Sequence, residues 1–249
     1  MQVVVDSLLT QYIRLGKGKS IVVLPGWADD SKNWGPFQQQ MANDFDVVVV
    51  DLPGFGGTQP PKTAWGLTEY ASFVGAFLRK TDIQPSAIIG HSNGGAVALR
   101  GLASKQFSVD KLVLLASAGI RNRYKGRKKI LRLITKSGKI LTMPLPSGVK
   151  QRLRRTVYRT IGSDMLVAEH LQETFKKVVE DDVQTDASSI NVPTLLIYGE
   201  KDQEAPVWYG EQFHQLITGS TLEVLPGAGH FVYLDRSKEV IKSILEFLA

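Results

Sequence analysis

The chain has 249 residues, of which 43% are hydrophobic and 22% charged, a composition that fits one or two globular domains and excludes a disordered, collagen-like or coiled-coil protein. It contains no cysteine, which excludes disulfides, thiolate metal sites and a cysteine nucleophile and is typical of a reducing compartment. The net charge of +6 is unevenly distributed: 14 Lys and Arg and no Asp or Glu lie between Arg121 and Thr160, whereas the rest of the chain holds 16 basic against 24 acidic residues, a balance of −8.

The first residues of the chain do not match the pattern of a signal peptide. They lack a basic segment and reach an acid at Asp6, which argues against a signal peptide. The longest purely apolar runs, such as residues 47–50, have the length of a strand, whereas a membrane span needs about 18 residues. We therefore expect a soluble, cytoplasmic protein.

The pattern of apolar residues predicts an α/β protein. Residues 3–5 and 9–15 are expected as two antiparallel strands at the edge of a sheet. Beyond them, short β-branched runs alternate with stretches of helical periodicity, and several runs are apolar on both faces, as in buried parallel strands. This alternation predicts a mostly parallel, doubly wound sheet. The predicted strands are 20–24, 46–50, 87–90, 111–115, 194–198 and 221–225, and the predicted helices are 68–80, 94–104, 207–217 and 237–248.

The alternation is interrupted once, between residues 121 and 190. This stretch contains helical patches at 130–134 and 165–179, separated by Pro144, Pro146 and Gly148, and no convincing strand. We expect it to be a helical cap inserted into a core formed by residues 1–120 and 191–249.

A nucleophile is predicted after the strand at 87–90. The letters Gly90-His-Ser-Asn-Gly94 match the G-x-S-x-G pattern, which is weak evidence alone. The position of the motif strengthens this evidence, because the motif follows a predicted strand and begins a predicted helix with the small residues Gly94, Gly95 and Ala96. A nucleophile elbow needs this arrangement, since the serine occupies a strained turn between strand and helix. Ser92 is therefore the candidate nucleophile.

A serine nucleophile needs a base, and the chain offers four histidines. His91 adjoins the nucleophile and is expected to point away along the turn, His170 lies in the insertion and His214 in a predicted helix. His230 follows a strand in a Gly-rich loop and is the predicted base.

The base needs an acid that orients its ring, and an acidic loop follows the predicted strand 194–198. Asp202 lies four residues past this strand and is the predicted acid. Glu200 and Glu204, in the same loop, are expected as solvated neighbours.

Two backbone amides are expected to hold an oxyanion. The strand at 20–24 is followed by Pro25-Gly-Trp, so the loop there would supply the amide of Trp27, with Gly26 allowing a close approach. Asn93, the residue after the nucleophile, would supply the second amide.

These motifs resemble those of the α/β-hydrolase superfamily, and the resemblance covers essentially the whole chain. The similar stretches are Leu24-Pro-Gly-Trp, Asp51-Leu-Pro-Gly-Phe-Gly-Gly-Thr58, Gly90-His-Ser-Asn-Gly-Gly95, Tyr198-Gly-Glu-Lys-Asp202 and Gly229-His230. Relatives usually carry His-Gly where this chain has Pro25-Gly26, so its oxyanion loop departs from the family pattern. The order Ser92, Asp202, His230 is the order of this superfamily. The resemblance implies an α/β-hydrolase fold with a small cap, similar to carboxylesterases and to carbon–carbon bond hydrolases of the meta-cleavage type.

Other enzyme classes fit the sequence less well. Gly18-Lys-Ser20 resembles the end of a phosphate loop, but position 13 is Ile13 where the motif needs Gly, and the stretch leads into a strand. No His cluster accompanies the acidic residues of the 200–204 loop, so no metal is expected. A serine hydrolase of this kind is also expected to use no cofactor. A non-catalytic binding module on the same fold is the alternative from another functional class.

The sequence thus predicts a serine hydrolase that cleaves carboxylic esters, with carbon–carbon and acyl-thioester hydrolysis as open alternatives. The acyl pocket is expected to be lined by Gly26, Trp27, Phe55, Met143, Leu145 and Trp208. The basic segment between Arg121 and Thr160 can be a solvated helix face, or can attract an anionic acyl carrier or a membrane surface. Nucleic acid is not expected, because no stacking pattern accompanies the charges. The sequence leaves the oligomeric state open.

Overall fold

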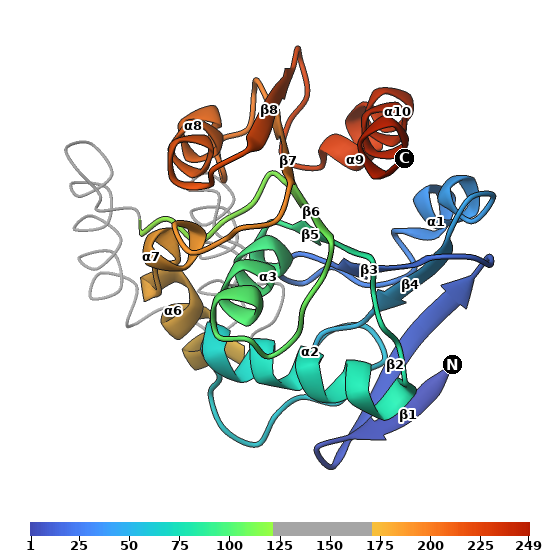
Figure 1. Ribbon diagram of the computed structural model, residues 1–249. Helices are drawn as coiled ribbons and strands as arrows, with labels where there is room; N and C mark the ends of the chain where they lie inside the picture. Colours follow the sequence, from blue (N-terminus) through green and yellow to red (C-terminus); the bar gives the residue numbers. More distant parts are fainter. Residues whose placement is uncertain (122–170) are drawn as a thin grey trace, which may run out of the picture.

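The computed structural model describes residues 1–121 and 171–249, and its central feature is an eight-stranded sheet (Figure 1). The strand order is β1-β2-β4-β3-β5-β6-β7-β8. The strands are β1 (Gln2–Val5), β2 (Leu8–Leu15), β3 (Ser20–Leu24), β4 (Asp46–Val50), β5 (Ala87–His91), β6 (Lys111–Leu115), β7 (Thr194–Gly199) and β8 (Ser220–Leu225).

The strands from β3 to β8 run parallel, and both antiparallel pairs of the sheet involve β2. β1 pairs antiparallel with β2, and β2 pairs antiparallel with β4, with Tyr12 opposite Val50. The predicted edge strands and the predicted mostly parallel sheet are therefore confirmed. β3 lies between β4 and β5, so the chain reverses its direction of winding there. In such sheets, ligands bind beyond the carboxyl ends of the strands near that point.

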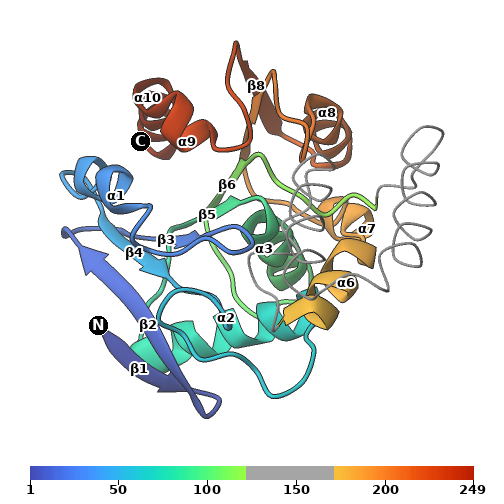
Figure 2. The ribbon, with the colours of Figure 1, turned by 180° about the vertical axis from the view of Figure 1, so that it is seen from behind.

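Helices cover both faces of the sheet (Figures 1 and 2). α2, α3, α7 and α8 contribute to one hydrophobic core, and α1, α9 and α10 contribute to the core on the opposite face. The described helices are α1 (Gly35–Met41), α2 (Leu67–Thr81), α3 (Asn93–Ala103), α6 (Gln172–Glu180), α7 (Gln184–Ala187), α8 (Val207–Leu216), α9 (Val232–Asp235) and α10 (Ser237–Leu248).

The two cores follow from the alternation of side chains along each buried strand. In β3, Val22 and Leu24 belong to one core, whereas Ile21 and Val23 belong to the other. Because both faces are covered, the strand is apolar at four successive positions, which is the pattern that the sequence showed.

The region expected to be a cap is described only from residue 171 onward. There it contains α6 and α7, and the described residues 171–190 hold no strand. The helical patch predicted at 165–179 continues beyond its expected end, because α6 ends at Glu180. The patch at 130–134 lies outside the described residues.

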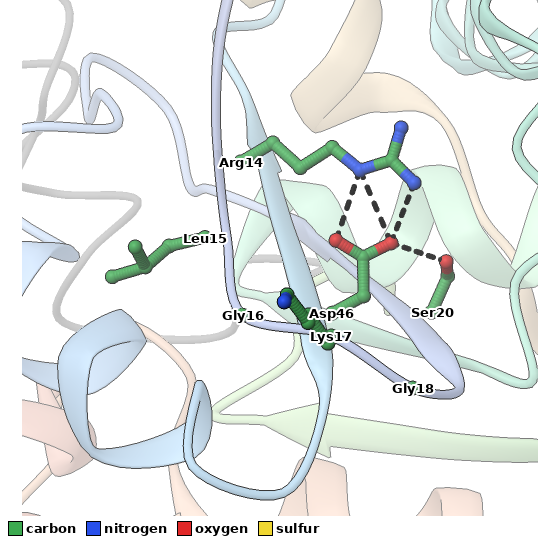
Figure 3. Close-up of a pocket in the computed structure, with 7 residues that line it drawn as sticks. All are labelled: Arg14, Leu15, Gly16, Lys17, Gly18, Ser20 and Asp46. Carbon is green, nitrogen blue, oxygen red and sulfur yellow. Dashed lines mark hydrogen bonds and ion pairs between the residues drawn. The ribbon is translucent and has the colours of Figure 1, made fainter.

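The glycine-rich turn between β2 and β3 has a structural role (Figure 3). Gly16 and Gly18 have φ values of +97° and +99°, which residues with a side chain rarely adopt. The turn leads into β3 rather than into a helix. Beside it, Arg14 donates two hydrogen bonds to one Asp46 oxygen and one to the other, and Ser20 also donates to Asp46. The glycines therefore form a turn between two strands, and the hydrogen bonds to Asp46 join β2, β3 and β4.

Candidate active site

Ser92 lies at the tight junction between β5 and α3. Its backbone has φ 51° and ψ −117°, a conformation that costs a non-glycine residue free energy. Small neighbours make the junction possible: a Cβ on Gly90 would overlap the backbone of Gly95, and a Cβ on Gly94 would overlap the carbonyl of Leu24. The predicted strand–turn–helix geometry is therefore present, with the hydroxyl of Ser92 at the helix N-terminus.

The structure brings Ser92, His230 and Asp202 together. The Ser92 Oγ lies 2.9 Å from His230 Nε2, and His230 Nδ1 lies 2.7 Å from Asp202 Oδ2. Because the Asp202 carboxylate accepts a hydrogen bond, the ring carries its proton on Nδ1, and Nε2 faces the Ser92 hydroxyl as a proton acceptor. The contacts link loops that follow β5, β7 and β8.

The Asp202 carboxylate is held by its own loop. Its other oxygen, Oδ1, accepts hydrogen bonds from the amides of Glu204 and Ala205, at 2.8 and 3.0 Å. The side chain is fully buried. A buried carboxylate that accepts hydrogen bonds on both oxygens is fixed in place, which suits it to orient an imidazole.

The backbone amides of Trp27 and Asn93 are the candidates for binding an oxyanion. Neither donates a hydrogen bond to any acceptor among residues 1–121 and 171–249. Asn93 is the first residue of α3, where helical N–H groups lack intrahelical partners and favour negative charge. A Cβ on Gly26 would lie 3.2 Å from the Ser92 Cβ, so the loop after β3 lies directly against the candidate nucleophile.

His91 does not point away from the site, contrary to expectation. Its Nε2–H donates to the backbone carbonyl of His230 at 3.1 Å, and its ring packs against the rings of His230, Phe231 and Tyr233. Burial, with the neighbouring His230, lowers the pKa of His91 to about 3. The ring is therefore neutral and supports the loop that carries the candidate base. The side chain reaches this loop because β5 and the β8–α9 loop end at the same edge of the sheet.

The two glutamates of the acidic loop also contact the candidate base or its loop. The Glu204 carboxylate lies 3.5 Å from His230 Nε2 with 35% of its side chain exposed, so it is more than the solvated neighbour we expected. Glu200 accepts a hydrogen bond from the amide of Gly227 at 2.8 Å. Sequence gave no signal for either contact, because both depend on where the following loop folds back.

A buried carboxylate, Asp29, joins the loop after β3 to the segment after His230. Its Oδ2 accepts hydrogen bonds from Trp34 Nε1 at 2.9 Å and from the Tyr233 hydroxyl at 3.0 Å. The rings of Trp34 and Tyr233 stack at 3.9 Å. Burial, together with Asp29, raises the pKa of Tyr233, so the tyrosine stays a neutral donor. Sequence reasoning missed this connection.

The predicted pocket residues have different surroundings. Trp27 is buried and packs edge-on against Phe55 and against Phe175, an α6 residue that the sequence did not indicate. Trp208 is 44% exposed and packs against Tyr209, so its indole is not enclosed in a pocket. Met143 and Leu145 lie outside the described residues.

Residues 1–121 and 171–249 contain no group of three His, Asp or Glu side chains placed to hold a metal ion. Within the same ranges, no helix is both long enough and apolar enough to cross a bilayer.

Comparisons with known proteins agree with the architecture. The sequence model described as "Alpha/beta hydrolase family" matches residues 21–243. A pimeloyl-[acyl-carrier protein] methyl ester esterase from Nitrosospira multiformis is 27% identical, with 94% of this chain and 95% of the relative covered. A 2-hydroxy-6-oxo-6-(2'-aminophenyl)hexa-2,4-dienoic acid hydrolase from Metapseudomonas resinovorans is 24% identical over 96% of this chain and 87% of its own. Among solved structures, the esterase EaEST from Exiguobacterium antarcticum superposes with a TM-score of 0.80 at 21% identity, covering 99% of this chain and 98% of that one. The α/β-hydrolase fold predicted from the motifs is thereby confirmed.

Proposed function

Because the chain belongs to the alpha/beta hydrolase family, we propose that it is a serine hydrolase that cleaves carboxylic esters through an acyl-enzyme. The observation that carries this proposal is the continuous contact from the Ser92 hydroxyl through the His230 ring to the Asp202 carboxylate. A module that only binds a ligand has no need of a base within hydrogen-bond reach of a serine in a strained turn.

In the first half of the proposed reaction, the Ser92 Oγ attacks the acyl carbonyl while His230 Nε2 takes its proton. Asp202 stabilises the imidazolium through Nδ1–H. The carbonyl oxygen becomes an oxyanion and accepts hydrogen bonds from the amides of Trp27 and Asn93, a contribution of about 3 kcal/mol per donor in comparable sites. The intermediate collapses when His230 Nε2–H protonates the departing alcohol, which leaves the acyl group on Ser92.

In the second half, water replaces the alcohol. His230 Nε2 takes a proton from the water, whose oxygen attacks the acyl-enzyme carbonyl, and the same two amides hold the oxyanion. Collapse returns the proton from His230 to Ser92 and releases the acid. The bonds formed and broken sum to hydrolysis of one ester to an acid and an alcohol.

Turnover of nitrophenyl esters of graded acyl length tests the proposal. We expect hydrolysis of at least one ester, labelling of Ser92 by a fluorophosphonate probe, and loss of both in Ser92→Ala. The matched control is Ser104→Ala, an exposed serine at the end of α3, which should keep both activities. Absence of labelling in a folded wild-type protein would favour the binding-module alternative.

Carbon–carbon bond hydrolysis is the second candidate, because one of the similar proteins is a dienoic acid hydrolase. A serine, a base and an oxyanion site serve this reaction as well as ester cleavage, and the acyl-thioester alternative needs the same groups. A meta-cleavage ketone and an acyl thioester therefore belong beside the esters in the assay. The substrate with the highest kcat/KM assigns the reaction, and a kcat/KM for the ketone far above that of every ester would overturn ester hydrolysis as the main activity.

An anionic acyl carrier is the partner that we propose for the basic segment. The proposal rests on charge alone: 14 basic and no acidic residues lie between Arg121 and Thr160 in a chain whose remainder is acidic. Residues 122–170 lie outside the described structure, and the dependence of turnover on salt tests the proposal.

A further inference from the structure

Unsatisfied buried polar atoms gather around Ser92. In residues 1–121 and 171–249, buried side-chain nitrogen or oxygen atoms without a hydrogen-bond partner occur in three residues, Trp27, His91 and Asn93. His91 and Asn93 flank Ser92 in the sequence, and Gly26, which precedes Trp27, lies against the Ser92 Cβ. Because proteins satisfy the great majority of their buried polar atoms, a group of unsatisfied ones in one place requires an explanation.

The unpaired nitrogen of His91 is explained without a ligand. Its unpaired atom is Nδ1, and a Cβ built on Gly26 would lie only 2.9 Å from this nitrogen, so the backbone of the β3 loop closes it off. Its Nε2 already binds the His230 carbonyl. The unexplained groups are therefore the Trp27 Nε1–H and the whole side-chain amide of Asn93, in residues that are 8% and 3% exposed.

Trp27 and the first turn of α3 both lie beside the α6–α7 segment. The Trp27 ring packs between Phe55, from the loop after β4, and Phe175 of α6. Asn93 is the first residue of α3. In the first turn of this helix, Ala96 lies beside Gly119, and Val183, the residue before α7, lies beside the same glycine. This is the region in which the acyl group would lie if the amides of Trp27 and Asn93 hold its oxyanion.

We propose that Trp27 and Asn93 form a polar subsite that binds an uncharged hydroxyl group on the acyl part of the substrate, close to the reacting carbonyl. The inference rests on the proposed function and narrows its substrate class. A hydroxyl oxygen accepts from Trp27 Nε1–H and Asn93 Nδ2–H, and its own proton is donated to Asn93 Oδ1, so one group satisfies all the unpaired atoms. A carboxylate would leave Oδ1 without a donor, and no cationic side chain lies within hydrogen-bond distance of either residue among those described.

The test compares kcat/KM for the nitrophenyl esters of butyric, 2-hydroxybutyric and 3-hydroxybutyric acids. After correction for spontaneous hydrolysis, we expect kcat/KM of one hydroxylated ester to exceed that of the plain ester by about tenfold or more. The reason is that a substrate without the hydroxyl leaves the buried polar groups of the site without hydrogen-bond partners. Trp27→Phe and Asn93→Leu keep the backbone amides but remove the polar atoms, so this ratio should fall towards one in each. Trp65→Phe is the matched control and should keep the ratio, because the Trp65 ring packs on Tyr70 and Phe73 of α2.

Equal kcat/KM for hydroxylated and plain esters would overturn the subsite, as would a preference that neither variant reduces. A binding measurement separates this failure from failure of the proposed function. Calorimetry on the Ser92→Ala protein with butyramide and its 2- and 3-hydroxy derivatives needs no turnover. The subsite predicts at least tenfold tighter binding of one hydroxylated amide, and equal or weaker binding of both contradicts it even if no ester is hydrolysed.

Discussion

At the scale of single residues, Asp202 is a sensitive test of the candidate triad. Asp202→Asn keeps an oxygen for the amides of Glu204 and Ala205, so we expect a melting temperature close to that of the wild type. The new NH2 group would face His230 Nδ1 and force the ring proton onto Nε2, where it blocks proton transfer from Ser92. We expect kcat to fall roughly 10³- to 10⁴-fold, as in comparable triads.

The measurement is steady-state hydrolysis of the best ester from the panel, with melting curves recorded on the same samples. Glu200→Gln, in the same loop, is the matched control and should retain most of its kcat, because its carboxylate contacts the Gly227 amide rather than the ring. A kcat of Asp202→Asn within tenfold of the wild type would contradict the assigned role.

The sequence identified residues whose position follows from topology. Ser92, Asp202 and His230 each follow a parallel strand, and the carboxyl ends of parallel strands share one edge of the sheet, so their proximity was predictable. Contacts that depend on side-chain reach were not. His91 and Asp29 could not be assigned from their neighbours in the sequence, because their partners lie 139 and 204 residues farther along the chain.

At the scale of secondary-structure elements, the Asp29–Tyr233 hydrogen bond connects the loop of Trp27 to the segment of His230. Tyr233→Phe removes this bond and keeps the ring stacked on Trp34. We expect kcat to fall about fivefold or more, since a misplacement of catalytic groups is costly, whereas KM changes little. Kinetics at saturating and limiting ester separate the two constants.

Tyr70→Phe is the matched control for this prediction. The Tyr70 hydroxyl is also buried and donates to the Pro53 carbonyl at 3.0 Å, so both variants lose one buried hydrogen bond of similar length. Both melting temperatures should fall, but only Tyr233→Phe should lose kcat. Equal losses of kcat in the two variants would show a general effect of stability.

Element prediction succeeded where packing constrains the sequence most. β3 to β7 are buried on both faces, so their apolar runs are unmistakable, and their predicted bounds differ from the observed ones by one residue at most. α1 and α9 were missed because helices of seven and four residues are too short to show a periodic apolar face. Both nevertheless position site residues, since α9 carries Tyr233 and Trp34 caps α1.

The junction of β2, β3 and β4 predicts how stability depends on pH. Burial alone would raise the pKa of Asp46, but the hydrogen bonds from Arg14 and Ser20 and the charge of Arg14 outweigh it and hold the pKa below its usual value. A lowered folded-state pKa stabilises the protein above the unfolded-state pKa, and this stabilisation disappears as the pH falls through the folded-state value.

We expect Asp46→Asn to lower the melting temperature at pH 7, where the carboxylate is ionised, by an amount that corresponds to about 1 kcal/mol or less, because Arg14 is 43% exposed and solvent screens the pair. The difference from the wild type should shrink as the pH falls from 5 towards 3. Melting curves at pH 7, 5 and 3 measure it, and Asp44→Asn serves as a nearby control. A difference that is constant with pH would contradict the ionic contribution.

At the scale of the whole molecule, the separation of charge along the chain is the largest feature without a structural explanation. The segment between Arg121 and Thr160 is basic throughout, whereas the remainder has a balance of −8. A basic segment raises the association rate of anionic partners, and salt weakens that attraction because the Debye length falls from about 30 Å at 0.01 M to about 10 Å at 0.1 M. If the acyl group arrives on an anionic carrier, turnover should therefore depend on ionic strength.

The measurement is kcat/KM between 0.01 and 0.3 M salt for an ester bound to an acidic acyl carrier and for a small neutral ester of the same acyl group. We expect kcat/KM for the carrier-bound ester to fall at least tenfold over this range, since electrostatic steering falls steeply with ionic strength, and that of the neutral ester to stay nearly constant. Replacing Arg127, Lys128 and Lys129 with Ser should flatten the first dependence, whereas replacing Lys17, Lys19 and Lys62, outside the segment, should not. If kcat/KM of the two esters depends equally on salt, the carrier proposal is wrong, and the basic segment does not take part in substrate recognition.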